Sequence, residues 1–248
     1  MTTGLFVASL FAALGTALCS NYTVGREAYL DFHITPKEPQ DEPIRGRIVI
    51  ALFTEALPMT TYSFAMIAKG FKKANPPHQL MHYKNSYVHR IVPDLIVQMG
   101  DVTVGDGSGG RSIYAPIFDD ENFFLSHRSA GWVSMANHGP DSNQSQFFLT
   151  LNKARWLDNK NVVFGRVIEG MELLKTLGSV EPDQFNGVPM QLIKITASGL
   201  YKLDKEYDLS EKDLDREDDI GAKGVYQKVE KEGKKEKEGE NKKKSKSV

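Results

Sequence analysis

The chain has 248 residues, of which 40% are hydrophobic and 25% charged, and its formal net charge of -1 is ordinary for a globular protein. Because 31 Lys and Arg residues balance 32 Asp and Glu residues, no overall positive field exists, and we expect no nucleic-acid partner. After residue 20 no uncharged apolar run approaches the roughly 18 residues of a spanning helix, so we expect no membrane span.

An apolar, uncharged stretch from Gly4 to Cys19 comes first and gives way at once to polar sequence. This pattern is typical of a secretory signal peptide, and Ala17 and Cys19 occupy the small-residue positions of a cleavage site. We assign residues 1–19 to a signal peptide, with a core strand as the alternative. Cys19 is the only cysteine, so cleavage would leave no disulfide, no catalytic thiol and no cysteine-bound metal.

Two triplets, beginning at Asn21 and Asn143, match the N-glycosylation pattern. They are glycosylation candidates only if the signal peptide is real, since such triplets also arise by chance. The expected location is the secretory pathway, with the endoplasmic reticulum lumen, a vacuole-like compartment and the exterior as open alternatives.

Residues 24–201 mostly alternate in hydrophobicity, as in residues 30–34 and 48–52, which predicts strands. Two segments break this alternation. Pro58 to Lys69 has a proline suited to a first helical turn and Gly70 just past its end, so it predicts a helix. Met171 to Leu177, followed by Gly178, predicts a second helix with its leucines on one face. Two helices among many strands favour a barrel whose ends the helices cover.

Residues 202–248 contain few aliphatic residues and many charged ones of both signs. Such a composition buries too little apolar surface to offset the entropy of ordering. We therefore predict three parts: a signal peptide (1–19), one folded domain (20–201) and a charged, disordered tail (202–248).

Two short patterns look like ligand sites. Gly105 to Gly110 has the spacing of a dinucleotide loop, but the residues that follow cannot begin a convincing helix, so we interpret it as a tight surface loop. His78 and His82 are spaced like zinc ligands, but they follow two prolines and lack a glutamate base. We expect a loop with incidental histidines, and no metal site.

Three longer stretches carry more information: 87–101, 134–149 and 156–165. Each permits a plain structural interpretation by itself, with Phe148 and Leu157 in the core and Arg90, Gln98 and Gln146 facing solvent. Together they resemble the cyclophilins, the peptidyl-prolyl cis-trans isomerase family, over residues 24–201. The matching motifs are His89-Arg-Ile, Gln98 with Gly100-Asp101, Gly107 to Tyr114, Phe118 to Phe123, Ser134 to Asn137, Ser145 to Phe148, Trp156 to Asp158 and Val162 to Gly165.

The resemblance implies a mainly β fold, an eight-stranded antiparallel closed barrel capped by two α-helices. It also implies that the chain accelerates rotation about Xaa-Pro bonds in secretory-pathway clients, with Arg90 as the catalytic residue. No cofactor is expected, and the implied partners are proline-containing segments of client proteins, bound by a monomer. The implied substrate-binding residues are Leu95, Ile96, Gln98, Ala136, Asn137, Gln146, Phe148, Trp156, Leu157 and Asn161.

Three positions depart from the family's usual residues: Leu95 replaces Phe, Ile96 replaces Met and Asn161 replaces His. His138 also replaces a small residue beside Asn137. These changes keep a second hypothesis open, namely a proline-peptide binding or chaperone module with little turnover. For cyclosporin, the family's cyclic-peptide ligand, Trp156 is permissive while Leu95 and Asn161 imply weak affinity.

Overall fold

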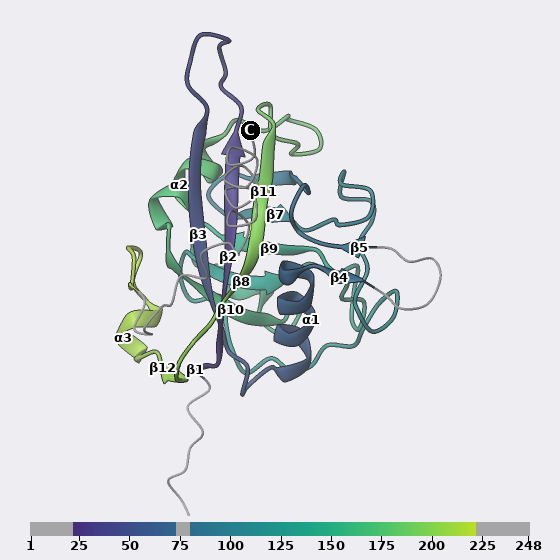
Figure 1. Cartoon of the computed structure of the whole chain (residues 1–248), viewed down its shortest axis with the longest axis vertical. Coiled ribbons are helices and arrows are strands. Elements are labelled where there is room, and N and C mark those ends of the chain that lie inside the picture. Colours follow the sequence, from purple (N-terminus) through teal and green to yellow (C-terminus); the bar gives the residue numbers. More distant parts are fainter. Residues whose placement is uncertain (1–21, 73–79, 222–248) are drawn as a thin grey trace, which may run out of the picture.

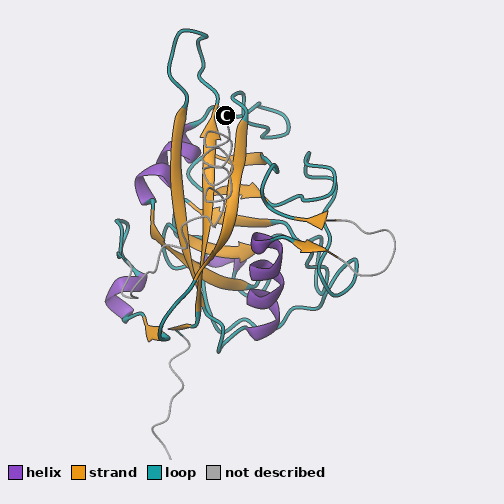
Figure 2. Ribbon diagram, in the orientation of Figure 1, coloured by secondary structure: helices purple, strands orange, loops and turns teal. Residues whose placement is uncertain are grey.

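Residues 22–72 and 80–221 are described by the computed structural model, and strands dominate them (Figures 1 and 2). One large sheet contains β2 (Arg26–Ile34), β3 (Ile44–Leu52), β6 (Val88–Val92), β7 (Ile96–Met99), β8 (Trp132–Met135), β9 (Phe147–Thr150), β10 (Val163–Glu169) and β11 (Ile193–Tyr201). Two small sheets pair β1 (Thr23–Val24) with β12 (Tyr207–Asp208), and β4 (Phe71–Lys72) with β5 (Leu80–Met81). The helices are α1 (Pro58–Lys69), η1 (Arg155–Leu157, a 3-10 turn), α2 (Met171–Ser179) and α3 (Glu211–Leu214).

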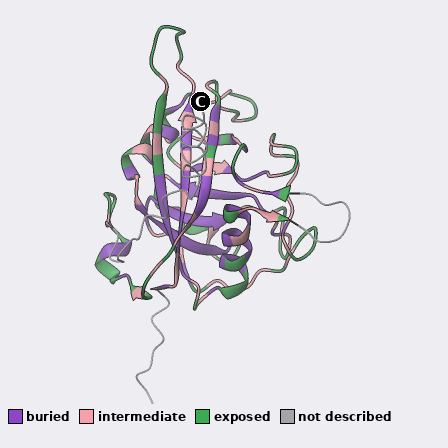
Figure 3. Cartoon of the chain, in the orientation of Figure 1, coloured by how far each residue is buried: buried purple, intermediate pink, exposed green. Residues whose placement is uncertain are grey.

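The large sheet is antiparallel throughout, in the order β11-β2-β3-β10-β8-β9-β7-β6, and it nearly closes into a barrel. Its end strands meet where Tyr87, just before β6, bridges Lys194 in β11, and where the Ile195 N–H donates to the Ser86 carbonyl over 2.9 Å. The predicted eight-stranded antiparallel barrel is thus confirmed, with closure at a few contacts. Buried residues follow its strands, whereas the hairpin joining β2 to β3 is largely exposed (Figure 3).

The first predicted helix is confirmed at both ends. Pro58 begins α1, and Gly70, at φ 96°, ends it in a conformation that glycine adopts readily. A distant carboxylate completes the N-terminus, because Glu121 accepts hydrogen bonds from the Met59 and Thr60 N–H groups over 2.8 and 2.7 Å. These bonds satisfy two of the amides that a helix leaves free at its start.

The second predicted helix is confirmed, but its predicted end is wrong by a short stretch. α2 continues through Gly178 to Ser179, with Leu174 and Leu177 buried. A side chain at position 178 would come within 2.6 Å of Leu151. Gly178 therefore permits close packing against Leu151 and does not mark the helix end, a distinction that sequence pattern alone cannot make.

The predicted boundary between domain and tail is wrong, because residues 202–221 pack onto the barrel. They form β12 and the third α-helix, α3, whereas two helices were predicted. Leu209 and Leu214 are buried in the main hydrophobic core, and Ser210 and Asp213 form a capping box at the start of α3. Residues 222–248 and the predicted signal peptide lie outside the described residues. Within the described ranges, no helix is both long and apolar enough to cross a membrane.

A buried arginine fastens this C-terminal segment. The guanidinium of Arg166 on β10 donates to the carbonyl of Ala130 and to that of Arg216, which follows α3. It also lies over the Trp132 ring, 5.7 Å from its centroid. Burial lowers the pKa of Arg166 to about 10, so it remains charged at neutral pH and depends on these carbonyls for compensation.

Candidate active site

Four neighbouring strands bring the central site residues into one row. In the register of the sheet, Arg90 on β6 lies opposite Gln98 on β7, Gln98 lies opposite Phe148 on β9, and Phe148 lies opposite Ser134 on β8. Because successive residues of a strand point to opposite faces, the neighbours of Gln98 and Phe148 fill the barrel core while this row faces outward. Residues up to 58 positions apart thus meet through strand pairing.

A chain of amide groups links this row to the glycine-rich loop. Gln146 donates to the Gly107 and Gly109 carbonyls over 2.8 and 2.6 Å, so its side-chain oxygen is left to accept from Gln98 Nε2 at 2.9 Å. The Gln98 oxygen then lies 3.5 Å from Arg90 Nη1, a long contact. The predicted support of Arg90 by Gln146 is therefore indirect and passes through Gln98.

The glycine-rich loop is organised by a carboxylate that sequence reasoning did not place in the site. Asp101 accepts hydrogen bonds of 3.0 Å from the N–H groups of Thr103, Val104, Gly107 and Gly109. Burial would raise its pKa, but these hydrogen bonds outweigh burial and lower the pKa of Asp101 to about 2. No helix begins at this loop, which confirms the tight surface loop and leaves no helix N-terminus to bind a nucleotide phosphate.

Phe148 rests on a histidine that the sequence also did not single out. The His127 ring stacks on Phe148 at an interplanar angle of 13°, with centroids 5.8 Å apart. Its Nδ1 lies 2.9 Å from Asp158 Oδ1 and its Nε2 lies 3.0 Å from Ser134 Oγ. This is the connectivity of a hydrolytic triad, but Ser134 and His127 have no exposed surface, so no substrate can reach the hydroxyl. The group instead holds Phe148 in place.

The same aspartate, Asp158, connects the η1 turn, which carries Trp156 and Leu157, to the His127 ring under Phe148. Asp158 also accepts the His127 N–H over 2.8 Å and pairs with Arg155, so it fixes the η1 turn that carries Trp156 and Leu157. Leu157 is half-buried, whereas Trp156 is 59% exposed. The roles of Leu157 in the proline pocket and of Trp156 at its rim stay predictions.

The remaining predicted apolar residues lie at the start of β7. Ile96 is 7% exposed and, like Phe148, is buried outside the main core cluster, on the face opposite to it. Diagonal neighbours on paired strands lie within side-chain reach, which places Ile96 beside Phe148. Leu95 is half-buried and accepts the Leu151 N–H through its carbonyl over 2.8 Å, so β7 and the end of β9 hold it.

The segment after β8 is tied down by two asparagines. The Asn161 side chain donates to the Met135 carbonyl over 3.0 Å, and the Asn137 side chain donates to the Lys160 carbonyl over 2.7 Å. The Ala136 N–H is already used, because it donates to the Gln146 carbonyl over 3.0 Å. The Ala136 N–H is therefore not free for a substrate, while the predicted substrate contacts through the Ala136 carbonyl and Asn137 stay predictions.

The glycosylation candidate at Asn143 is wrong for the folded domain. Asn143 is completely buried, and its amide donates to Asp120 Oδ1 over 2.8 Å and to the Phe118 carbonyl over 3.3 Å. A glycan on this nitrogen has no room, because the side chain is fully enclosed. The backbone bridge between Asn143 and Phe118 holds it there. The other candidate, Asn21, lies outside the described residues.

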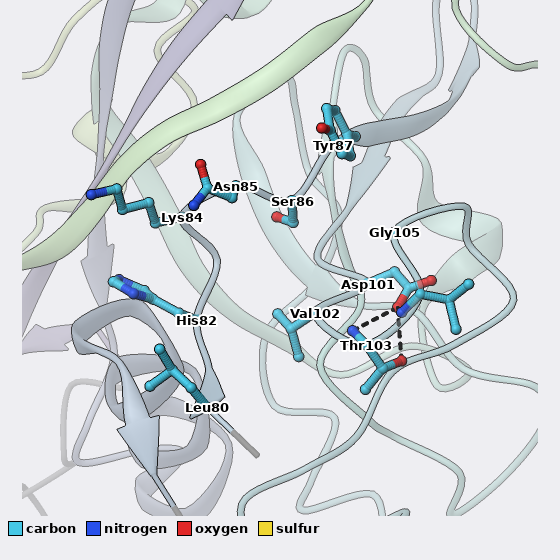
Figure 4. A pocket seen from close by; sticks show the side chains of 11 residues that line it. Leu80, His82, Lys84, Asn85, Ser86, Tyr87, Asp101, Val102, Thr103 and Gly105 are labelled. Carbon is cyan, nitrogen blue, oxygen red and sulfur yellow. Dashed lines mark hydrogen bonds between the residues drawn. The ribbon is translucent and has the colours of Figure 1, made fainter.

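A separate hollow of about 430 Å³ lies between residues 80–87 and residues 101–105 (Figure 4). Leu80, His82 and Lys84 line one side of it, and Val102 and Thr103 the other. None of the predicted site residues lines it. His82 Nε2 lies 3.1 Å from the Ala68 carbonyl, which accounts for this histidine without a metal, and His78 lies outside the described residues.

Comparison with known protein families agrees with this geometry. The family model described as cyclophilin type peptidyl-prolyl cis-trans isomerase/CLD matches residues 38–200. The match spans the strands that carry Arg90, Gln98 and Phe148 as well as the η1 turn. The chain therefore belongs to the cyclophilin-type peptidyl-prolyl cis-trans isomerase family.

Proposed function

We propose that this chain is a working peptidyl-prolyl isomerase that assists the folding of secretory-pathway proteins. The observation that carries the proposal is the outward-facing row of Arg90, Gln98 and Phe148, held in register by three adjacent strands. Rotation about an Xaa-Pro bond breaks amide resonance, with a barrier of about 18–20 kcal/mol, and needs no nucleophile. A catalyst has only to hold the proline and favour the twisted amide.

Each part of the row fits one of these tasks. Arg90 is exposed on β6, so its guanidinium can donate to the proline nitrogen, which regains its lone pair when the amide twists. Ile96, Phe148 and Leu157 offer apolar contact for the proline ring. Gln98, whose amide N–H is fixed by Gln146, orients the flanking peptide group. Because the Gln98 side chain is already fixed by Gln146, little reorganisation of this group accompanies the twist.

The second candidate is a binding module with little turnover. Two observations favour it: the Arg90–Gln98 contact is long, at 3.5 Å, and Leu95 supplies no aromatic wall. Both affect how well the twisted amide is held, and neither removes the donor. We therefore place the isomerase first.

Exchange spectroscopy on a short Xaa-Pro peptide separates the two candidates, because it measures binding and cis-trans exchange in the same sample. Accelerated exchange at catalytic protein concentrations supports the isomerase. Peptide binding without acceleration supports the binding module, and the absence of both contradicts each candidate.

The secretory location rests on the apolar stretch Gly4 to Cys19. We expect the protein recovered from a eukaryotic secretory host to begin at or near Ser20, as read by N-terminal sequencing. A product that retains residues 1–19 would contradict this location. The same material reports glycosylation, which we now expect at Asn21 and not at the buried Asn143.

Two further parts of the proposal concern partners. We expect a monomer, checked by sedimentation, and weak inhibition by cyclosporin. Trp156 is exposed and can meet a cyclic peptide, but Leu95 offers it less flat surface than an aromatic ring would. An inhibition constant for cyclosporin equal to that of a cyclophilin that has the family's usual residues at positions 95, 96 and 161 would contradict this expectation.

A further inference from the structure

The loop between α2 and β11, residues 181–190, packs directly beside Arg90. The Gly187 carbonyl accepts a hydrogen bond from the Ile91 N–H over 2.7 Å. Ile91 lies on β6, which is the last strand in the order of the large sheet. A Cβ on Gly187 would lie 3.3 Å from Arg90 Cγ and 3.0 Å from the Ile91 carbonyl. This loop therefore forms the surface next to the catalytic arginine on the side away from Gln98.

Beside this contact, a hollow of about 440 Å³ is lined by residues of the loop and of the chain around β6, Arg90 among them. Arg90, Val92 and Pro93 line one side of it, and Asp183, Phe185 and Asn186 are on the other. Arg90 thus belongs both to the catalytic row and to this hollow. A chain bound at the row therefore meets the edge of the hollow at Arg90.

The loop is held in one shape by its own hydrogen bonds. The Asp183 carboxylate accepts the Phe185 and Asn186 N–H groups over 2.9 and 3.2 Å, and its backbone N–H donates to the Val188 carbonyl over 2.7 Å. Pro182 and Pro189 form a bridge at its base. The backbone of such a loop is ordered before binding, which reduces the entropy lost when a partner binds.

This ordered loop directs apolar side chains into solvent. Phe185 is 97% exposed, Met190 is 70% exposed and Leu192, just beyond the loop, is 54% exposed. Scattered apolar residues on a surface are ordinary, but Phe185 also lines the hollow next to Arg90, and an exposed aromatic side chain beside a binding site is typical of an interaction surface.

We propose that loop 181–190 is an accessory binding surface for apolar residues that flank the proline of an unfolded client chain, with Phe185 as its main contact. This inference rests on the proposed isomerase function and narrows its substrate class to prolines in apolar segments. The occupant is the client chain because the hollow is continuous with Arg90. Its charged lining consists of one arginine and one aspartate, so it gives no preference for a charged segment.

The test compares two peptides and two matched variants. One peptide is a proline tetrapeptide, and the other is a decapeptide with two leucines on each side of the same proline. Phe185→Ser is the test variant. Phe124→Ser is the control, since Phe124 is 69% exposed and does not line this hollow. Both positions are exposed, so both variants should fold, which thermal melting checks.

We expect Phe185→Ser to raise KM for the decapeptide about fivefold relative to its KM for the tetrapeptide, with kcat unchanged, as partial loss of an aromatic contact implies. Phe124→Ser should leave this ratio at the wild-type value. An unchanged ratio in Phe185→Ser, with normal wild-type turnover, would overturn the accessory surface alone. Absence of wild-type turnover on both peptides would contradict the proposed function itself. A concentration-dependent dimer that Phe185→Ser dissociates would assign the surface to a second copy of the chain and overturn the proposal.

Discussion

Arg90 is exposed on β6 and makes a long hydrogen-bond contact with Gln98, so its guanidinium contributes little to the fold and is available for the proposed chemical role. We expect Arg90→Ala to lower kcat/KM by about 10²–10³, the usual effect of losing one positioned donor, while leaving the melting temperature near that of the wild type. Exchange spectroscopy and thermal melting measure the two effects. Arg45→Ala, which removes an exposed arginine from β3, is the matched control. Near-normal turnover of Arg90→Ala would show that another group assists rotation.

Leu95 is the departure from the family pattern that changes the apolar wall most directly. We expect Leu95→Phe to raise kcat/KM about fivefold, because an aromatic face beside a bound ring contributes about 1 kcal/mol beyond its area. The gain should appear as a lower KM, since residue 95 contacts the bound proline ring equally in the ground state and in the transition state. Leu80→Phe, at a 57% exposed leucine in the separate hollow, is the control. If Leu95→Phe weakens binding, the site has adapted to clients that need the smaller side chain.

Asn161 is a different kind of departure. Its amide donates to the Met135 carbonyl and so holds the segment that leads to Asn137. A histidine at position 161 would restore the family's usual side chain at the rim of the site. It would also have to replace the hydrogen bond that Asn161 now makes. Residues that differ from a family pattern can therefore have taken on structural contacts that the pattern does not show.

At the scale of an element, the η1 turn depends on Asp158. We expect Asp158→Ala to lower the free energy of unfolding by about 3 kcal/mol and to raise KM, because it leaves the buried His127 without its charged partner and releases Trp156 and Leu157. Urea unfolding and steady-state kinetics measure these effects. Arg155→Ala removes only the exposed partner of Asp158 and should cost less than about 1 kcal/mol. Equal losses in the two variants would mean that the exposed ion pair, and not His127, fixes the turn.

At the scale of the whole molecule, residues 202–221 complete the fold. We expect a chain ending at Tyr201 to melt roughly 10 °C below a chain ending at Gly221, because it loses the burial of Leu209 and Leu214 and leaves Arg166 without the Arg216 carbonyl. Scanning calorimetry on the two truncations gives the difference directly. Equal melting temperatures would show that the segment contributes little despite its burial.

The stability of the whole molecule should also depend on two buried histidines. Burial lowers the pKa of His89 and of His127, although Asp101 and Asp158 oppose the shift. The unfolded chain, with histidine pKa values near 6.5, therefore binds more protons below that pH, and the free energy of unfolding should fall as pH drops from about 7.5 to about 5. The free energy of unfolding should fall further at still lower pH. The Asp101 carboxylate has a pKa of about 2 in the folded chain and a higher one in the unfolded chain, so its stabilising contribution is lost as pH falls toward 2.

Urea unfolding at several pH values tests this expectation. Replacing His89 and His127 by glutamine should flatten the dependence between about pH 7.5 and about pH 5. Stability that is level or rising toward lower pH in the wild type would contradict the assignment.

The sequence alone predicted those features that depend on local pattern. Pro58 and Gly70 marked both ends of α1, and alternating residues marked β2, because a chain's local preferences and the period of its apolar residues act over a few positions. Resemblance in several motifs also pointed to Arg90, Gln98 and Phe148. Their sequence positions became one row only because β6, β7 and β9 pair in a definite register.

The tertiary structure decided the features that depend on distant contacts. No local signal connects His127 to Phe148, or Glu121 to the start of α1, since each pair is joined only when distant segments of the chain pack together. The same reason explains two wrong predictions. Leu209 and Leu214 are too few to indicate a core by composition, yet the barrel supplies the surface that buries them, and Asn143 matches a glycosylation pattern but is enclosed when Phe118 pairs with it. Sequence determined the elements and the chemistry of the candidate residues, while packing between elements determined which residues are held, exposed or enclosed.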